Sequence, residues 1–146
     1  MATYSFLDVS AAIVGPGGGF NLGSGAGVAE EGISVRMIED KNTMQIGADG
    51  TGQHSLHAGK AAAVEVTVLK TSPVNAQLRI MYDLQTASSS LHGKNTITVV
   101  NSESGDVSTC TQCAFKKLPD LKYSKDAGTN VWAFDVVAVN GFMGIY

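Results

Sequence analysis

Residues 33–49 read ISVRMIEDKNTMQIGAD, and two runs with strand character flank Lys41-Asn42. Apolar and polar residues alternate in both runs, which is the pattern of a β-strand with one face on a core and one in water. The stretch predicts a long β-hairpin, 33–49, with arms at 33–40 and 43–49. We expect its apolar face to pack on the domain and its polar face to stay exposed; these faces are Val35, Met37, Met44 and Ile46, and Ser34, Arg36, Thr43 and Gln45.

The segment that precedes the hairpin, residues 15–32, is rich in glycine: eight of its 18 residues are Gly. Glycine loses more backbone entropy on ordering than any other residue, so this composition predicts a loop. Such a long loop is unusual in a compact domain, and long loops are often functional. We expect this one to become ordered against a neighbouring subunit, with Phe20 and Leu22 as its apolar anchors.

The rest of the chain is predicted to form strands and one helix. Ser72 suits a helix N-cap and Pro73 the first helical position, which indicates a helix over 73–87. Its apolar stripe at helical spacing is Val74, Leu78, Met81 and Tyr82, while Asn75 is expected to face away. Because strand follows strand without a βαβ repeat, the sequence favours a mainly antiparallel α+β fold in one domain, 1–146. The other predicted strands cover 4–14, 60–70, 95–101, 107–118 and 131–140.

Composition and charge limit the class of function. Hydrophobic residues make up 44% of the 146 residues, enough for a real core, and the net charge is −3. Residues 1–59 carry six acidic and two basic residues, a balance of −4, whereas residues 60–146 carry seven acidic and eight basic, a balance of +1. A net negative charge without a cluster of Lys and Arg argues against a protein that binds nucleic acid through its phosphates. We expect no membrane span and no signal peptide, and hence synthesis in the cytoplasm.

Candidate chemical groups are few. Cys110 and Cys113 have redox or zinc spacing, but in a strand, residues three apart point to opposite faces, and two further zinc ligands are missing. His54 and His57 lie in a predicted loop without partners nearby. The glycines of residues 15–32 are followed by neither a helix nor a Lys-Ser/Thr pair, as a phosphate loop requires. We therefore predict no catalytic residue, cofactor or metal site.

The whole chain resembles the tail tube proteins of contractile-tailed bacteriophages. Four stretches carry the likeness: the start MATYSFLDVSAAIVGPGGGFNLG, the hairpin ISVRMIEDKNTMQIGADG, the helix SPVNAQLRIMYDLQ and the closing strand VWAFDVVAVNG. The resemblance implies a ring-forming tail-tube fold, an antiparallel β-sandwich or partial barrel with one flanking helix. Six copies would form a ring, and stacked rings would form a hollow tube, as in related bacteriocin and type VI secretion tubes.

The resemblance also implies partners. They are other copies of the chain, a tail sheath protein, a tape-measure protein in the lumen, and DNA that passes through without specific binding; the tube would belong to a virion assembled in the cytoplasm of the host bacterium. The lumen-facing residues would be Ser34, Arg36, Thr43 and Gln45, and the inter-ring contacts would be Phe20, Leu22, Glu30 and Glu31. Two alternatives stay open: a monomeric ligand-binding β-barrel with a cavity under Trp132 and Phe134, and a thiol enzyme that uses Cys110 and Cys113.

Overall fold

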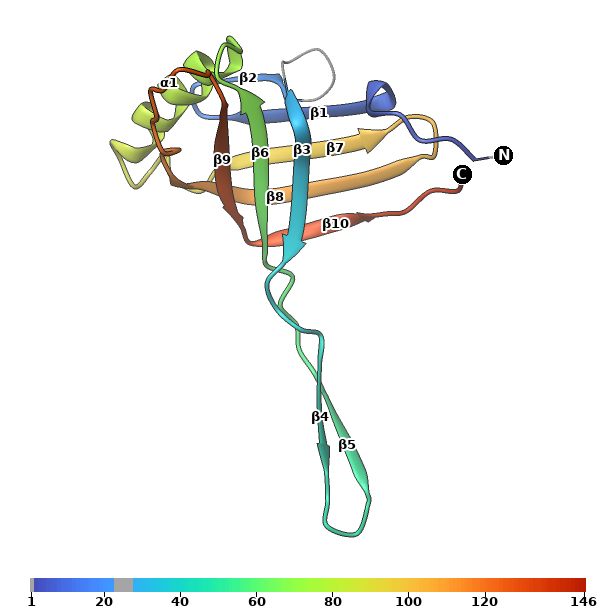
Figure 1. Ribbon diagram of the computed structural model, residues 1–146. Helices are drawn as coiled ribbons and strands as arrows, with labels where there is room; N and C mark the ends of the chain where they lie inside the picture. The colour runs from blue at the N-terminus through green and yellow to red at the C-terminus, as the bar shows by residue number, and fades with distance from the viewer. Residues whose placement is uncertain (1, 23–27) are drawn as a thin grey trace.

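The computed structural model describes residues 2–22 and 28–146, with the side chains of residues 28–31 left aside. Within these ranges the chain forms a short 3-10 turn, ten strands and one α-helix (Figure 1). In chain order the elements are η1 Phe6–Asp8, β1 Val9–Gly15, β2 Gly18–Asn21, β3 Val28–Met37, β4 Asn42–Ile46, β5 Gly52–Leu56, β6 Ala62–Leu69, α1 Val74–Thr86, β7 Asn95–Asn101, β8 Asp106–Lys117, β9 Thr129–Val136 and β10 Ala138–Phe142.

Eight of the ten strands form two packed sheets, and every strand pairing within these sheets is antiparallel. Sheet A has the order β2-β1-β7-β8-β10, and sheet B has the order β3-β6-β9-β8. The long strand β8 belongs to both, because its first part pairs with β7 and β10 and its last residues pair with β9. In Figure 1 the strands of sheet B run across those of sheet A. The predicted mainly antiparallel β-sandwich with one helix is confirmed.

The core lies between the sheets, and α1 closes one end of it. On β6, Val64, Val66 and Val68 alternate with residues of the opposite face, and all three are fully buried. The helix contributes the predicted stripe, with Val74, Leu78 and Met81 buried and Tyr82 packed against the cluster. The predicted helix is confirmed to within a residue at each end. No helix in the described part of the chain is long and apolar enough to cross a membrane.

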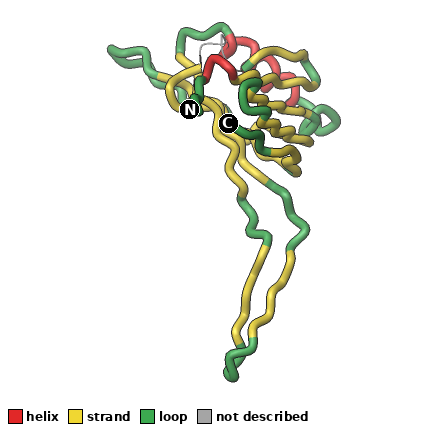
Figure 2. Tube along the Cα trace, turned by 90° about the vertical axis from the view of Figure 1, so that its right-hand side faces the viewer, coloured by secondary structure: helices red, strands yellow, loops and turns green. Residues whose placement is uncertain are grey.

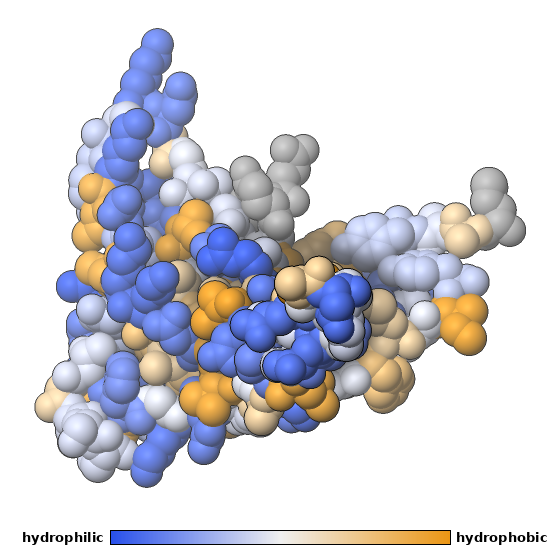
Figure 3. Space-filling model, turned by 90° about the horizontal axis from the view of Figure 1, so that it is seen from below, coloured by the Kyte–Doolittle hydropathy of each residue, from blue (hydrophilic) through white to orange (hydrophobic). Residues whose placement is uncertain are grey.

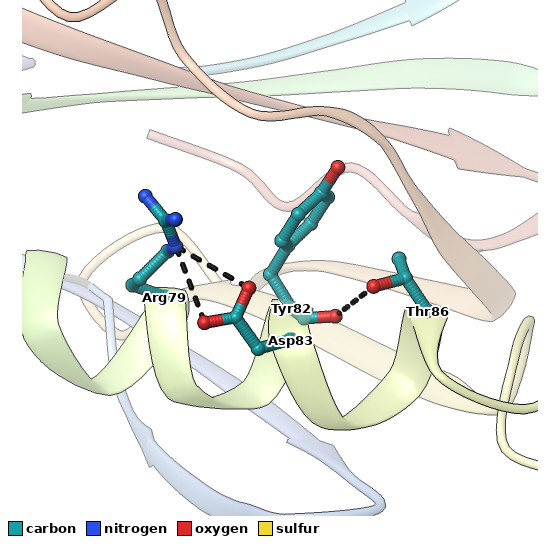
Figure 4. Close-up of polar contacts among 4 residues, drawn as sticks. All are labelled: Arg79, Tyr82, Asp83 and Thr86. Carbon is teal, nitrogen blue, oxygen red and sulfur yellow. Dashed lines mark hydrogen bonds and ion pairs between the residues drawn. The ribbon is translucent and has the colours of Figure 1, made fainter.

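Polar contacts on the helix differ between its two sides. On the solvent side Arg79 Nε lies 3.3 Å from a carboxylate oxygen of Asp83, and Thr86 donates to the carbonyl of Tyr82 at 2.8 Å (Figure 4). The expectation that Asn75 faces away is wrong. Its Oδ1 accepts a hydrogen bond from Trp132 Nε1 at 3.0 Å, which links the first turn of α1 to β9. A buried Trp needs such an acceptor, and Asn75 is close enough to supply it.

The predicted hairpin over 33–49 is wrong in its pairing. Strand β3 pairs with β6, with Ile33 opposite Val66 and Met37 opposite Ala62. Strand β4 pairs with β5 instead, around a turn at 47–51 in which Gly50 has φ +90° and Gly47 N–H donates to the Thr51 carbonyl at 2.7 Å. Glycine accepts this positive φ without strain, so the chain reverses there and not at residues 41–42.

Three other boundaries shift. The predicted first strand, 4–14, begins with the 3-10 turn and becomes a strand only at Val9. The predicted loop 15–32 contains β2 and the start of β3, while its residues 23–27 lie outside the described ranges. The predicted strand 131–140 is two strands separated at Val137, because β9 pairs in sheet B and β10 in sheet A.

Candidate assembly surfaces

Strands β4 and β5 form a two-stranded ribbon that projects from the sandwich into solvent (Figures 1 and 2). All ten residues of the two strands are exposed. Residues opposite each other in an antiparallel pair share a face. One face, called here the apolar face, therefore carries Met44, Ile46 and Leu56 beside Asn42, Gly52 and His54. The other is polar and uncharged, with Thr43 opposite Ser55 and Gln45 opposite Gln53.

The two ribbon histidines tie its strands together. Asn42 Nδ2 lies 3.1 Å from His54 Nδ1, and Thr43 Oγ1 lies 2.7 Å from His57 Nε2. Lys41 Nζ also donates to the carbonyl of His57 at 3.2 Å. In the described residues no group of three or more His, Cys, Asp and Glu side chains could hold a metal ion. The geometry thus assigns both rings to cross-strand hydrogen bonds.

The apolar face of the ribbon has no partner within its own chain. We expected Met44 and Ile46 to pack on the domain, and this is wrong: they are 57% and 59% exposed. Val35 and Met37, at the end of β3 nearest the ribbon, are also partly exposed. An isolated two-stranded ribbon is only marginally stable in water. The ribbon is therefore a surface that gains stability when another molecule covers it.

Sequence reasoning missed half of this surface. His54 and His57 were predicted to lie in a loop, yet residues 50–59 contain β5 and the exposed Leu56. The signal was present in the alternation of Gln53 and Ser55 with His54 and Leu56. The glycines around it obscured that signal.

Sheet B offers a second surface, on the face turned away from the core. Ser34 and Arg36 lie on this outer face, level with Glu65 and Ala63 of β6. On β9 and β8 it continues with Asp135, which is opposite Ala63, and with Lys117, which is opposite Ala133. The face is mixed in charge and not acidic. Thr43 and Gln45 lie on the separate ribbon, so the four predicted lumen residues do not form one continuous wall.

Sheet B also ends in two open edges. Within the described residues, β3 pairs only with β6, and the last residues of β8 pair only with β9. Since every pairing is antiparallel, directions alternate along β3-β6-β9-β8, and β8 runs opposite to β3. An unpaired edge is a template for another strand.

Seen from below, hydrophobic and hydrophilic patches alternate over the surface around the ribbon (Figure 3).

The C-terminal tail presents a further group of apolar side chains. Met143 and Ile145 are 92% and 89% exposed. The tail is nevertheless held in place: Gly144 N–H donates to Asp106 at 2.5 Å, and Ile145 N–H donates to the Ser104 carbonyl at 3.0 Å. A Cβ on Gly144 would lie 1.7 Å from that same Ser104 oxygen, so the close approach depends on glycine.

The four residues predicted to contact another ring differ in their surroundings. Leu22 is fully buried in the core of its own subunit, and Phe20 packs partly against that core. Both therefore anchor the glycine-rich segment internally. Glu30 and Glu31 lie in β3, but their side chains fall outside the described set. Their proposed contacts stay a prediction.

The two thiols are buried in the core. Cys110 and Cys113 were expected on opposite faces, and this is wrong, because a bulge at Thr111 and Gln112 (φ +53°) adds one residue and turns both thiols to the core. Burial raises the pKa of Cys110, and burial, with a smaller effect of Cys110, raises that of Cys113 from 9.0 to about 12. A redox thiol needs the opposite shift, toward the thiolate.

The space that a ligand would need beneath Trp132 and Phe134 is filled. The ring of Phe115 lies 6.0 Å from that of Trp132 and 4.7 Å from that of Phe134, centroid to centroid. Tyr82 packs edge-on to Phe115 at 5.6 Å. Phe115, Trp132 and Phe134 are all buried. This packing does not support a monomeric ligand-binding barrel.

The fold and these surfaces define an antiparallel β-sandwich subunit with one flanking helix, open sheet edges and a projecting ribbon. The chain belongs to the Bacteriophage PhiTE tail tube protein family, whose sequence profile matches residues 1–144. It is thus a structural tail tube protein, a component of a phage tail. No curated protein sequence matches it significantly.

Solved structures of similar fold come from tails and injection systems. One is the tail of an empty GTA particle with C6 symmetry (TM-score 0.63, 10% identity, 96% of this chain and 99% of that chain). Another is the tube-terminating cap of the anti-feeding prophage (0.60, 11%, 99% and 95%). A third is the sheath-tube complex of the extracellular contractile injection system PVC (0.57, 10%, 97% and 92%). At this identity the likeness establishes the fold.

Proposed function

We propose that six copies of this chain close into a ring, and that the rings stack into the hollow inner tube of a contractile phage tail. Membership of the tail tube family supports the tube itself. The fold shared with the C6-symmetric GTA tail supports six-fold symmetry, and the fold shared with the PVC sheath-tube complex supports a surrounding sheath. The role is structural, not catalytic.

The observation that carries the proposal is the pair of open edges of sheet B. Strands β3 and β8 lie at opposite ends of this four-stranded sheet and run in opposite directions. If β8 of one copy pairs with β3 of the next, the antiparallel alternation continues across the joint. Such a head-to-tail contact closes into a ring and removes the open edges. The inner wall would then be one continuous sheet.

In this arrangement the outer face of sheet B lines the lumen, with Ser34 and Arg36 on it. The charges of Arg36 and Lys117 balance those of Glu65 and Asp135, so each copy adds no net charge to the wall from these four residues. A wall without net positive charge does not displace the counterions of DNA, and this displacement is the main source of non-specific affinity for DNA. DNA could then pass without specific binding, after the tape-measure protein that would first occupy the lumen. Assembly would take place in the host cytoplasm.

Proline substitution of the β3 edge tests ring closure. Successive N–H groups of an edge strand point alternately to the neighbouring strand and to the open edge. Of Ser34→Pro and Val35→Pro, we therefore expect one to disturb the β3–β6 pairing and the other to keep the fold but block ring formation. Folding is followed by the emission of Trp132, and rings by sedimentation and negative-stain microscopy.

The two proline variants serve as controls for each other. Wild-type chain that stays monomeric at all salt and pH conditions would refute the proposed ring. A proline variant that is native in stability and still forms rings, while its neighbour unfolds, would show that rings close through a surface other than this edge.

A further inference from the structure

The sequence contains seven asparagines, and only Asn140 is followed by glycine. The backbone nitrogen of the next residue can attack an asparagine side chain, and this attack is fastest before glycine, which has no side chain to shield the nitrogen. The pair Asn140-Gly141 is therefore the most labile asparagine position in the chain. It lies near the end of β10, the strand that leads into the C-terminal tail (Figure 1).

The structure requires glycine at residue 141. Gly141 has φ +153°, and a Cβ built on it would lie 1.9 Å from the carbonyl oxygen of Val107 on the neighbouring strand β8. Any other L-residue would collide with that backbone. The close approach of β10 to β8 therefore keeps a labile pair at this position.

The attacking nitrogen faces away from the strand ladder. Strand β10 pairs with β8 on one side, and on the other side Val139 N–H donates to the Lys60 carbonyl at 3.3 Å. Because N–H groups two residues apart in a strand point the same way, Gly141 N–H also points away from β8. No hydrogen bond to the described residues holds it on that side. A base in the solvent can therefore reach this proton.

The attacked carbonyl group is polarised by a lysine. Asn140 is exposed, and its Oδ1 accepts a hydrogen bond from Lys60 Nζ at 3.2 Å. An ammonium group at this oxygen stabilises the negative charge that develops on it as the nitrogen attacks Cγ. An extended backbone keeps Cγ apart from the next nitrogen, so the strand must open locally first. Opening is easy near a strand end, and Gly141 is one residue from the end of β10.

We propose that Asn140-Gly141 is a site of spontaneous deamidation. A base removes the proton of the Gly141 nitrogen, this nitrogen bonds to Cγ of Asn140, and the side-chain nitrogen takes up a proton and leaves as ammonia. Water then opens the resulting cyclic imide at either carbonyl, which leaves aspartate or isoaspartate at residue 140. The reaction needs a single chain and therefore does not depend on ring assembly.

The isoaspartate product would release the C-terminal tail. It adds a methylene group to the backbone of β10, which shifts the residues after it out of register. Those residues include Phe142, which is opposite Val107, and Ile145, whose N–H donates to the Ser104 carbonyl at 3.0 Å. The aspartate product keeps the backbone length and gains an ion pair with Lys60.

Peptide mapping by mass spectrometry tests the site. The native chain is incubated in mildly alkaline buffer, and deamidation of each asparagine is followed by its gain in mass. Asn42 is the internal control, because it is also exposed, lies in a strand and has a hydrogen-bonded side chain, but precedes Thr43. We expect Asn140 to deamidate at least about tenfold faster than Asn42. Comparable rates, or an intact Asn140 after a free peptide of residues 136–144 has fully reacted, would overturn the inference.

Two substitutions test the contribution of Lys60. Lys60→Met removes the ammonium group at similar side-chain length, whereas Lys60→Arg keeps a cation beside Oδ1. We expect deamidation of Asn140 to slow at least about threefold in Lys60→Met and to change less than about twofold in Lys60→Arg. Equal rates in Lys60→Met and the wild-type chain would refute the polarising role.

Hydrogen exchange of the Ile145 amide tests the release of the tail. In the isoaspartate fraction of aged wild-type protein this exchange should become at least about tenfold faster. Asn140→Gln is the control, because its longer side chain closes a ring far more slowly, and its exchange should not change with age. Faster exchange in both aged chains, or in neither, would contradict the release of the tail by isoaspartate.

Discussion

A buried amide pair offers a sharp test of what holds the sandwich to its helix. The side chains of Gln85 on α1 and Asn95 on β7 are fully buried and exchange two hydrogen bonds of 2.7 Å. Gln85 Nε2 also donates to the carbonyl of Pro16 at 2.8 Å. One side chain thus joins the end of the helix, the start of β7 and the β1–β2 turn. Gln85→Leu removes all three hydrogen bonds at similar side-chain size.

The size of the effect follows from the groups left behind. The variant leaves the buried Asn95 amide and the partly buried Pro16 carbonyl without these partners. A buried polar group left unsatisfied costs about 1–3 kcal/mol. We therefore expect Gln85→Leu to lower the free energy of unfolding by about 2–5 kcal/mol. This is a large part of the roughly 5–15 kcal/mol typical of a folded domain.

Urea unfolding measures the loss. The sequence has one tryptophan, Trp132, and it is 3% exposed, so its emission reports global unfolding. The control is Arg79→Ala, which removes the exposed ion pair with Asp83 and should change stability by no more than about 0.5 kcal/mol. The double variant Gln85→Leu/Asn95→Ala should lose less than the sum of the single losses. A loss below about 1 kcal/mol for Gln85→Leu, or strict additivity, would refute the reasoning.

Three further outcomes are expected. Burial raises the pKa of Cys113 from 9.0 to about 12, so this thiol ionises at lower pH in the unfolded chain than in the folded one. The free energy of unfolding should therefore fall between about pH 9 and 12. In urea unfolding, Cys113→Ala should remove up to about 1.4 kcal/mol per pH unit of this fall. Gly144→Ala would press its Cβ on Ser104, and hydrogen exchange of the Ile145 amide should become at least tenfold faster, with little change in global stability. Asn75→Ala leaves the indole N–H of Trp132 without its acceptor and should cost about 1–2 kcal/mol in urea unfolding; an unchanged midpoint would contradict the role of this bond.

Local pattern was enough to predict the helix and most of the strands. The stripe that begins at Val74 and the Ser72-Pro73 start predicted α1, because helical spacing and end signals are contained in a short window. The sequence likewise predicted strands over 60–70 and 131–140, and the structure buries Val66 and Phe134 on β6 and β9. The resemblance in four stretches pointed to the family that the sequence profile then established.

Strand partners could not be predicted in this way, because pairing depends on residues distant in the chain. Alternation in residues 33–49 is the same whether Met37 belongs to a hairpin with β4 or to a pairing with β6. The partner of β3 is decided by which strand can bury its apolar face in the core. Strand β6 is buried on its inner face, whereas β4 is exposed. The bulge that turns Cys110 and Cys113 to one side is also invisible to a period of two, since it arises from the register between β7 and β8.

The candidate surfaces were also predictable only in part. The sequence by itself determined which residues are polar or apolar, that the chain carries no clustered positive charge, and that one helix flanks a set of antiparallel strands. Only the tertiary structure decided that Ser34 and Arg36 share a face with Asp135, that Thr43 and Gln45 stand apart on a ribbon, and that Leu22 is internal. The physical reason is that a side chain's type is a local property, whereas its neighbours are set by register and by the packing of two sheets.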